Sequence, residues 1–143
     1  MFADQSRSSA RDTFFNTWKK FKNNEPLEAL EKIILEIIHN HPEYHAILEN
    51  PDEYREEDFK PSQGRENPFL HMGLHMGLIE QLHTDRPQGI LEVYKILGKK
   101  LDNPHLVEHK MIEVLAAYMW EVMRSNGDYD DAVYLERMKR LLS

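Results

Sequence analysis

The sequence predicts an all-α protein, built as a single-domain helical bundle of about five to six helices with an up-down core. Two observations lead to this prediction. Apolar residues recur at helical spacing through nearly every segment, and residues that start or stop helices separate these segments. No stretch alternates between apolar and polar residues for long enough to predict a strand. With 143 residues, the chain is long enough to bury a core as one domain over residues 1–143.

The first half of the chain is expected to hold two helices and a short helical piece. The first helix is predicted to begin near Ser8 or Ser9, since serine caps helices well. The second has Pro26 in its predicted first turn. Pro42 then breaks the helix, and a short piece follows to about Leu48. The apolar positions expected on the first helix are Phe14, Trp18 and Phe21, and those on the second are Leu27, Leu30, Ile34, Ile37 and His41.

Residues 50–67 interrupt this pattern. They include two prolines and a glycine, show no helical period and are rich in acidic residues. A connection of this length is longer than usual in a compact domain. We therefore predict a long acidic loop, which serves either as a solvated surface or as a lid.

The second half of the chain is expected to hold four more helices. The helix after Pro68 is apolar nearly all round, which predicts a central and buried position for it. The third of the four is long and is expected to end at Arg124 or Ser125, before Asn126-Gly127. The expected starting points of the four helices are Asn67, Asp85, Asn103 and Asp130.

Composition excludes several classes of function. The chain has no cysteine, which rules out disulfides, cysteine-based zinc sites and a thiol nucleophile. Its net charge of -7 argues against nucleic acid as a partner, because binding to phosphates requires a basic surface. The N-terminus lacks the apolar core of a signal peptide, and no apolar run approaches the ~20 residues that span a bilayer. We therefore expect a cytoplasmic protein that has no membrane partner.

The histidines carry the main functional signal. All eight lie between His39 and His109, and six of them form three pairs four residues apart. About 0.4 such pairs would be expected by chance. Residues four apart share a helix face, so that two imidazoles can chelate one ion. The pairs are His41/His45, His71/His75 and His105/His109.

These pairs predict a metal site. If successive long helices run antiparallel, all three pairs converge on one end of the bundle. We expect the ligands to be His71, His75, His105 and His109, or three of these with a carboxylate, and Zn or Fe suits imidazole best. His41 and His45 are reserve ligands because Pro42 interrupts the helix between them. His39 and His83 are expected at the surface or in a supporting role, and the candidate carboxylates are Glu43, Glu80, Glu108 and Glu113.

Residues His105 to His109 also match an inverted zincin motif, in which two histidines bind zinc and a glutamate activates water. Glu108 would then be the catalytic base of any hydrolysis. Only 34 residues follow His109, too few for the large domain that surrounds such a site in peptidases. Peptidase chemistry is accordingly the less favoured interpretation.

Other classes of function remain open alternatives. The histidines could form a buried polar network in an adaptor or oligomer-forming protein, since a histidine on an apolar face is commonly hydrogen-bonded within the core. A homodimer fits this alternative. A third alternative is a metal-free enzyme that uses histidine and glutamate as acid and base on an unknown small-molecule ligand.

Four short words resemble a known family. In order they are HPEYH from His41, NPFLHMGLH from Asn67, DRPQGI from Asp85 and HLVEH from His105. Together they resemble the bacterial family catalogued as domain of unknown function eighteen forty-one, over roughly Phe14 to Leu142. The resemblance implies a small helical bacterial protein, and it brings no established activity, substrate or cofactor.

Overall fold

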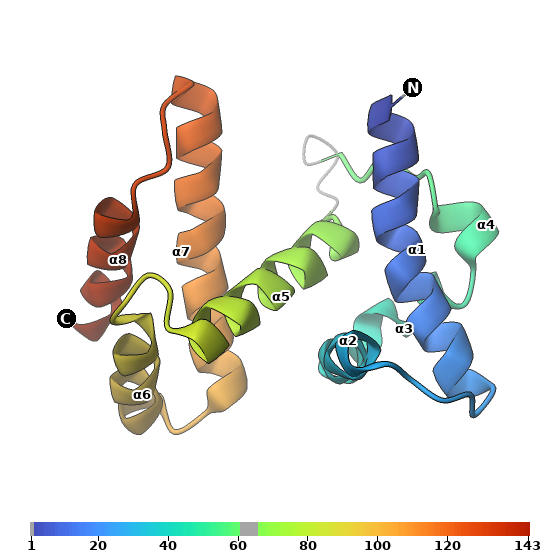
Figure 1. Cartoon of the computed structure of the whole chain (residues 1–143), viewed down its shortest axis with the longest axis horizontal. Helices are drawn as coiled ribbons and strands as arrows, with labels where there is room; N and C mark the ends of the chain where they lie inside the picture. The colour runs from blue at the N-terminus through green and yellow to red at the C-terminus, as the bar shows by residue number, and fades with distance from the viewer. Residues whose placement is uncertain (1, 61–65) are drawn as a thin grey trace. The chain divides into compact units, whose positions relative to one another are not determined.

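The structure is a computed structural model (Figure 1). It describes the backbone of residues 2–60 and 66–143 and the side chains of residues 9–60 and 66–143. The described residues contain eight α-helices and no strand, so the predicted all-α class is confirmed. The count exceeds the predicted five to six because α3 and α4 are single-turn helices. None of the described helices is both long and apolar enough to cross a bilayer.

The chain divides into two compact units, Met1–Gly73 and Leu74–Ser143. The division falls inside one helix, α5 (Pro68–Thr84), so no loop or change in composition marks it. The N-terminal unit contains α1 (Phe2–Lys22), α2 (Ala29–His39), the 3-10 turn η1 (Pro42–Tyr44), α3 (His45–Leu48) and α4 (Pro51–Tyr54). The C-terminal unit contains α6 (Ile90–Leu101), α7 (Pro104–Ser125), α8 (Asp131–Lys139) and the 3-10 turn η3 (Arg140–Leu142).

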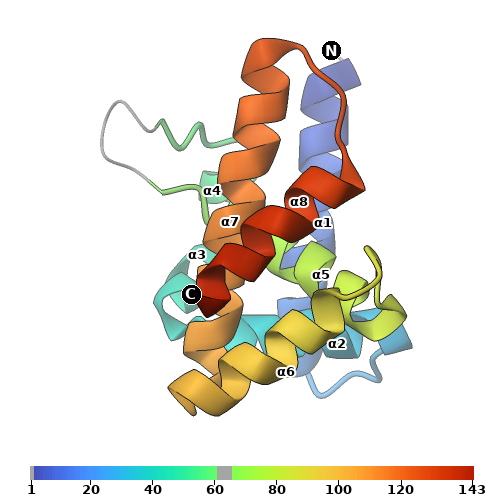
Figure 2. The ribbon, with the colours of Figure 1, turned by 90° about the vertical axis from the view of Figure 1, so that its left-hand side faces the viewer.

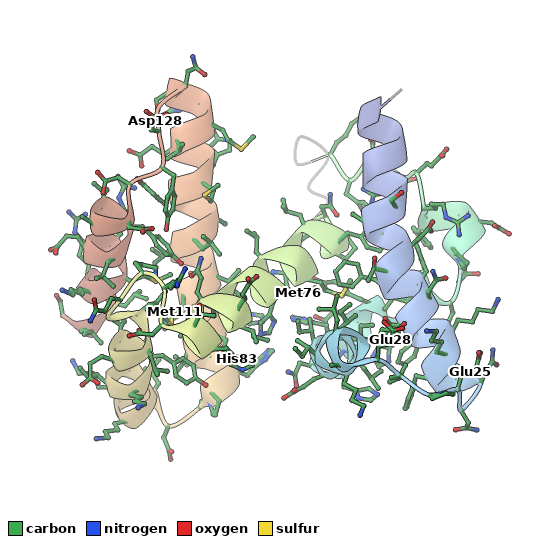
Figure 3. All side chains as sticks on the ribbon, viewed as in Figure 1. Glu25, Glu28, Met76, His83, Met111 and Asp128 are labelled. Atoms are coloured by element: carbon green, nitrogen blue, oxygen red, sulfur yellow. The ribbon has the colours of Figure 1, made fainter. Side chains whose placement is uncertain are left out.

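The helix starts in the N-terminal unit differ from the sequence prediction. Helix α1 begins at Phe2 rather than near Ser8 or Ser9, since no proline or glycine before these serines prevents the helix from extending backward. Helix α2 begins at Ala29, so Pro26 lies before it and not in its first turn. Glu28 caps α2 instead (Figure 3), and its backbone N–H donates to the Glu31 carboxylate at 3.0 Å.

A buried arginine fixes the segment that follows α4. Arg11 of α1 is only 3% exposed, and its guanidinium donates to the backbone carbonyls of residues 54, 55 and 57 at 2.8–3.2 Å. The same group lies over the ring of Phe69 at 4.7 Å and near that of Phe59. Arg11 therefore holds backbone from the middle of the chain against α1.

Residues 50–67 are more ordered than the predicted loop. They include the single-turn helix α4 and the buried side chain of Phe59. Pro51, whose presence had argued against a helix, instead starts one. Proline is well suited to the first helical position, which Pro51 occupies. Residues 61–65 of the predicted loop lie outside the described residues.

The C-terminal unit is built on a contiguous apolar core. Helices α6 and α8 both pack on α7 and on each other (Figures 1 and 2). Met111 of α7 lies in this core and is fully buried (Figure 3). The other fully or largely buried members include Leu78, Leu82, Ile90, Val93, Leu97, Val107, Ile112, Leu115, Tyr118, Tyr134 and Met138.

The start of α6 shows a variant of the predicted cap. Asp85 does cap the helix, but its carboxylate accepts from the backbone N–H groups of Gly89 and Leu91, both at 3.1 Å. Gly89 has φ 106°, a left-handed conformation that favours glycine, and this turn moves the first helical residue to Ile90.

Candidate functional site

His41 is buried at the start of η1. Helix α2 ends at His39, and the backbone of His41 leaves the helical conformation at φ -128°, ψ 67°, because Pro42 follows it. The imidazole is 1% exposed, and its Nδ1 lies 2.9 Å from the Glu43 carboxylate. The sequence predicted that His41 continues the apolar face of the second helix. In the structure His41 lies after the end of α2, so that prediction is wrong.

His71 of α5 lies beside His41 in the N-terminal unit. The Asn67 side chain caps α5 by accepting from the N–H groups of Phe69 and Leu70, which sets the direction in which the helix starts. The ring centroids of His71 and His41 are 4.7 Å apart at an interplanar angle of 84°. Nδ1 of His71 is 3.4 Å from the Glu66 carboxylate.

Tyr44 completes this histidine group. Its ring stacks on His41 at 5.1 Å and 19°. Burial raises the pKa of the Tyr44 phenol, and the nearby charges of Glu66 and Glu43 raise it further, so that the phenol stays protonated at neutral pH. Partial burial opposes ionisation of Glu43, but the hydrogen bonds with the His41 side chain and with the backbone of Glu43, together with the nearby imidazoles of His41 and His71, outweigh that effect, so the pKa of Glu43 is lowered.

His45 has a different environment from His41, although the two are four residues apart. Its Nε2–H donates to the backbone carbonyl of Ile38 at 2.9 Å, and its ring lies 4.4 Å from that of Trp18. The exposed His39 packs edge-on against Trp18 and Phe21 nearby. The structure thus brings His41 together with His71 and places His45 in an aromatic cluster with α1.

The C-terminal unit holds a second histidine group. His75 of α5 is fully buried, and its Nε2 is 3.4 Å from the carboxylate of Glu108. Its ring centroid is 6.4 Å from that of His109, which in turn is 4.2 Å from that of His105. The first two turns of α7 contain His105, Glu108 and His109, and Asn103 caps this helix. Histidines from two helices therefore meet beside one carboxylate.

Glu108 is the carboxylate that lies beside the histidines of this second group. Burial raises the pKa of Tyr94, and the charge of Glu108 contributes to the same shift, so this phenol also stays protonated near the glutamate. The other predicted carboxylates of this unit, Glu80 and Glu113, are exposed. His83 is exposed as well, near the C-terminal end of α5 (Figure 3).

Sequence reasoning missed three residues of these groups, namely Glu66, Tyr44 and Tyr94. Glu66 comes just before the cap of α5 and had no motif to mark it. Tyr44 lies within the HPEYH word, and its ring stacks on the nearby His41. Helical spacing could not identify either residue, because His41 lies outside a regular helix and Glu66 precedes α5.

A scan against family models matches residues 6–140 to the family described as domain of unknown function (DUF1841). The chain belongs to this family. The resemblance noted from the four short words is therefore confirmed. Comparison with curated proteins finds no match, and comparison with solved structures finds none either.

Proposed function

We propose that this DUF1841 protein binds a divalent transition metal through its histidines. Each unit offers its own candidate site, with His41 and His71 as ligands in the N-terminal unit and His75, His105 and His109 as ligands in the C-terminal unit. The proposal rests on one observation. In each unit, imidazoles from two separate segments lie with ring centroids 4.7–6.4 Å apart, and a carboxylate lies within 3.4 Å of one of them.

The donor set favours zinc or iron. Neutral imidazole suits Zn²⁺ and Fe²⁺, whereas Mg²⁺ and Ca²⁺ prefer sites made of oxygen ligands. The chain has no cysteine, so nitrogen and oxygen are the only strong donors that it offers. Glu108 is the residue that we assign as base if a bound ion activates water for hydrolysis.

The competing proposal is an adaptor or oligomer-forming protein in which the histidines serve as buried polar links. The burial of His75 against Glu108 and of His41 against Glu43 supports it, because buried polar groups are normally paired. This alternative predicts that His75→Ala destabilises the fold by leaving Glu108 unpaired, and that a chelator has no effect.

Thermal melts separate the two proposals. Untagged full-length protein is stripped with EDTA and melted with Zn²⁺, Fe²⁺ or Mn²⁺. If the ion binds the folded state, an excess of about 100 Kd adds about 2.7 kcal/mol to the free energy of unfolding. Metal analysis of the purified protein gives the number of ions bound.

Matched double variants locate the ligands. We expect His41→Ala/His71→Ala and His75→Ala/His109→Ala each to lose the metal stabilisation that its own unit's site provides, while the other site still binds. The control is His39→Ala/His83→Ala, which removes two exposed histidines that are not among the proposed ligands and is expected to respond like the wild type. Metal binding is excluded if the wild type contains no metal and none of the three ions raises its midpoint.

A further inference from the structure

His41 and His71, both in the N-terminal unit, face carboxylates through the same ring atom. Nδ1 of His41 is 2.9 Å from Glu43, and Nδ1 of His71 is 3.4 Å from Glu66. A carboxylate at Nδ1 favours the neutral tautomer in which that nitrogen carries the proton. The lone pair of each imidazole is then on Nε2, the form that can bind a metal.

The two rings are close enough to share an ion. Each ring offers a nitrogen, and these nitrogens lie within 4.8 Å of each other. Two imidazoles on one tetrahedral zinc, with Zn–N bonds of about 2.0–2.1 Å, have nitrogens about 3.3 Å apart. A small rotation of the side chains therefore suffices to bring both nitrogens onto one ion.

The carboxylates are themselves held in place. The Tyr44 phenol, whose pKa is raised by burial, interacts with Glu66 through a side-chain hydrogen bond. The Tyr44 ring also stacks on His41. Glu43 is two residues after His41, in the first turn of η1, so its position is fixed by local backbone. Carboxylates that orient metal-binding histidines in this way typically raise the metal affinity 10–100-fold.

We infer that Glu43 and Glu66 are positioning residues that present His41 and His71 as Nε2 ligands to Zn²⁺ or Fe²⁺. This inference rests on the proposed metal binding and specifies its ligand atoms. Glu43 and Glu66 act through the histidines and are not themselves ligands. Removing their charge while keeping their size should weaken binding without removing the ligands.

The first test is the tautomer in metal-free protein. Long-range ¹H–¹⁵N NMR correlations distinguish the two neutral tautomers of each histidine. We expect His41 and His71 to carry the proton on Nδ1 in the wild type. A proton on Nε2 of either ring would overturn the inference for that ring, and this measurement needs no variant and no metal.

The second test is Zn²⁺ affinity by calorimetry on full-length Glu43→Gln and Glu66→Gln. Each should bind Zn²⁺ about 10–100-fold more weakly than the wild type. Both side chains are more than half exposed, so the variants are expected to fold, which circular dichroism checks. The control is Glu53→Gln on α4, an exposed glutamate that we expect to leave affinity unchanged.

The outcomes distinguish the inference from the proposed function. If His41→Ala/His71→Ala binds as many Zn²⁺ ions as the wild type and with the same affinities, this pair is not a metal site and both proposals fail for it. If that variant loses binding but the glutamine variants bind like the wild type, metal binding holds and the role of Glu43 and Glu66 is wrong.

Discussion

The two units of this protein bury different kinds of side chain. Among the described residues, the N-terminal unit buries three polar or charged side chains, Arg11, Thr17 and His41, whereas the C-terminal unit buries only His75. The C-terminal core is otherwise a continuous apolar cluster on α5 to α8. Both units bury apolar side chains, and the N-terminal unit adds a buried arginine, threonine and histidine to them. Similar helical patterns in sequence can therefore produce cores of different polarity.

The largest expected effect comes from the apolar core of the C-terminal unit. Met111→Ala should lower the free energy of unfolding by about 2–5 kcal/mol, because it leaves a cavity in a fully buried site. Urea unfolding followed by circular dichroism measures this loss. Met123→Ala on the same helix is the control, since that side chain is 75% exposed and its loss should cost less than about 0.5 kcal/mol.

The same variant also tests whether the two units unfold together. Each unit has one tryptophan, Trp18 or the exposed Trp120, so Trp120→Phe leaves a reporter only in the N-terminal unit. For the predicted single domain, Met111→Ala in this background should shift the Trp18 fluorescence transition together with the circular dichroism. An unmoved Trp18 transition would show that the units unfold separately.

A smaller loss is expected from the polar contacts of the N-terminal unit. Arg11→Ala should cost about 2–3 kcal/mol, since it leaves three backbone carbonyls without their charged donor. Arg55→Ala serves as the matched control. Its ion pair with Asp12 is more than a third exposed and should contribute at most about 1 kcal/mol. Equal losses in the two variants would contradict the assigned role of Arg11.

The smallest effect concerns one exposed ion pair in each unit. The pKa of Glu121 lies below its ordinary value of 4.5, chiefly because Arg137 donates a hydrogen bond to its carboxylate. The pKa of Glu31 is also lowered, first by a hydrogen bond from the backbone N–H of Glu28 and then by one from Lys20. Because these pKa values are lower in the folded state, the stabilisation is present above pH 4.5. It is lost as the pH falls through the lowered values.

Glu121→Gln should therefore flatten the acid side of the stability profile, measured as urea midpoints between about pH 3 and pH 7. Glu31→Gln should do the same in the N-terminal unit. Glu136→Gln on α8 is the control, because Glu136 is an exposed glutamate, and its profile should match the wild type. A wild-type profile in Glu121→Gln would show that the pair with Arg137 contributes no pH dependence.

The fold was largely predictable because its determinants are local. The caps at Asn67, Asn103 and Asp130 act over three residues, and the structure contains all three. The starts of α1 and α2 were not predictable to the residue, since serine and proline favour a start without requiring one there. The helix within residues 50–67 was missed because its single turn is too short to show a period.

The candidate site was only half predictable. The spacing of four identified the histidines, because it records a shared helix face. It could not show that Pro42 would turn His41 toward His71 and leave His45 against Trp18. Nor could it show that Glu108 faces His75 and that Glu66 faces His71, since these pairs join residues from different segments.

The sequence by itself determined the helical class, the starts of α5, α7 and α8, the family and the set of histidines available to a metal. These follow from composition, motif words and interactions between residues a few positions apart. Only the tertiary structure decided the division into two units inside α5 and which carboxylate faces which imidazole. The division and the pair of His75 with Glu108 depend on packing between segments distant in the chain. The pair of His41 with Glu43 depends on the turn at Pro42, which helical spacing does not record.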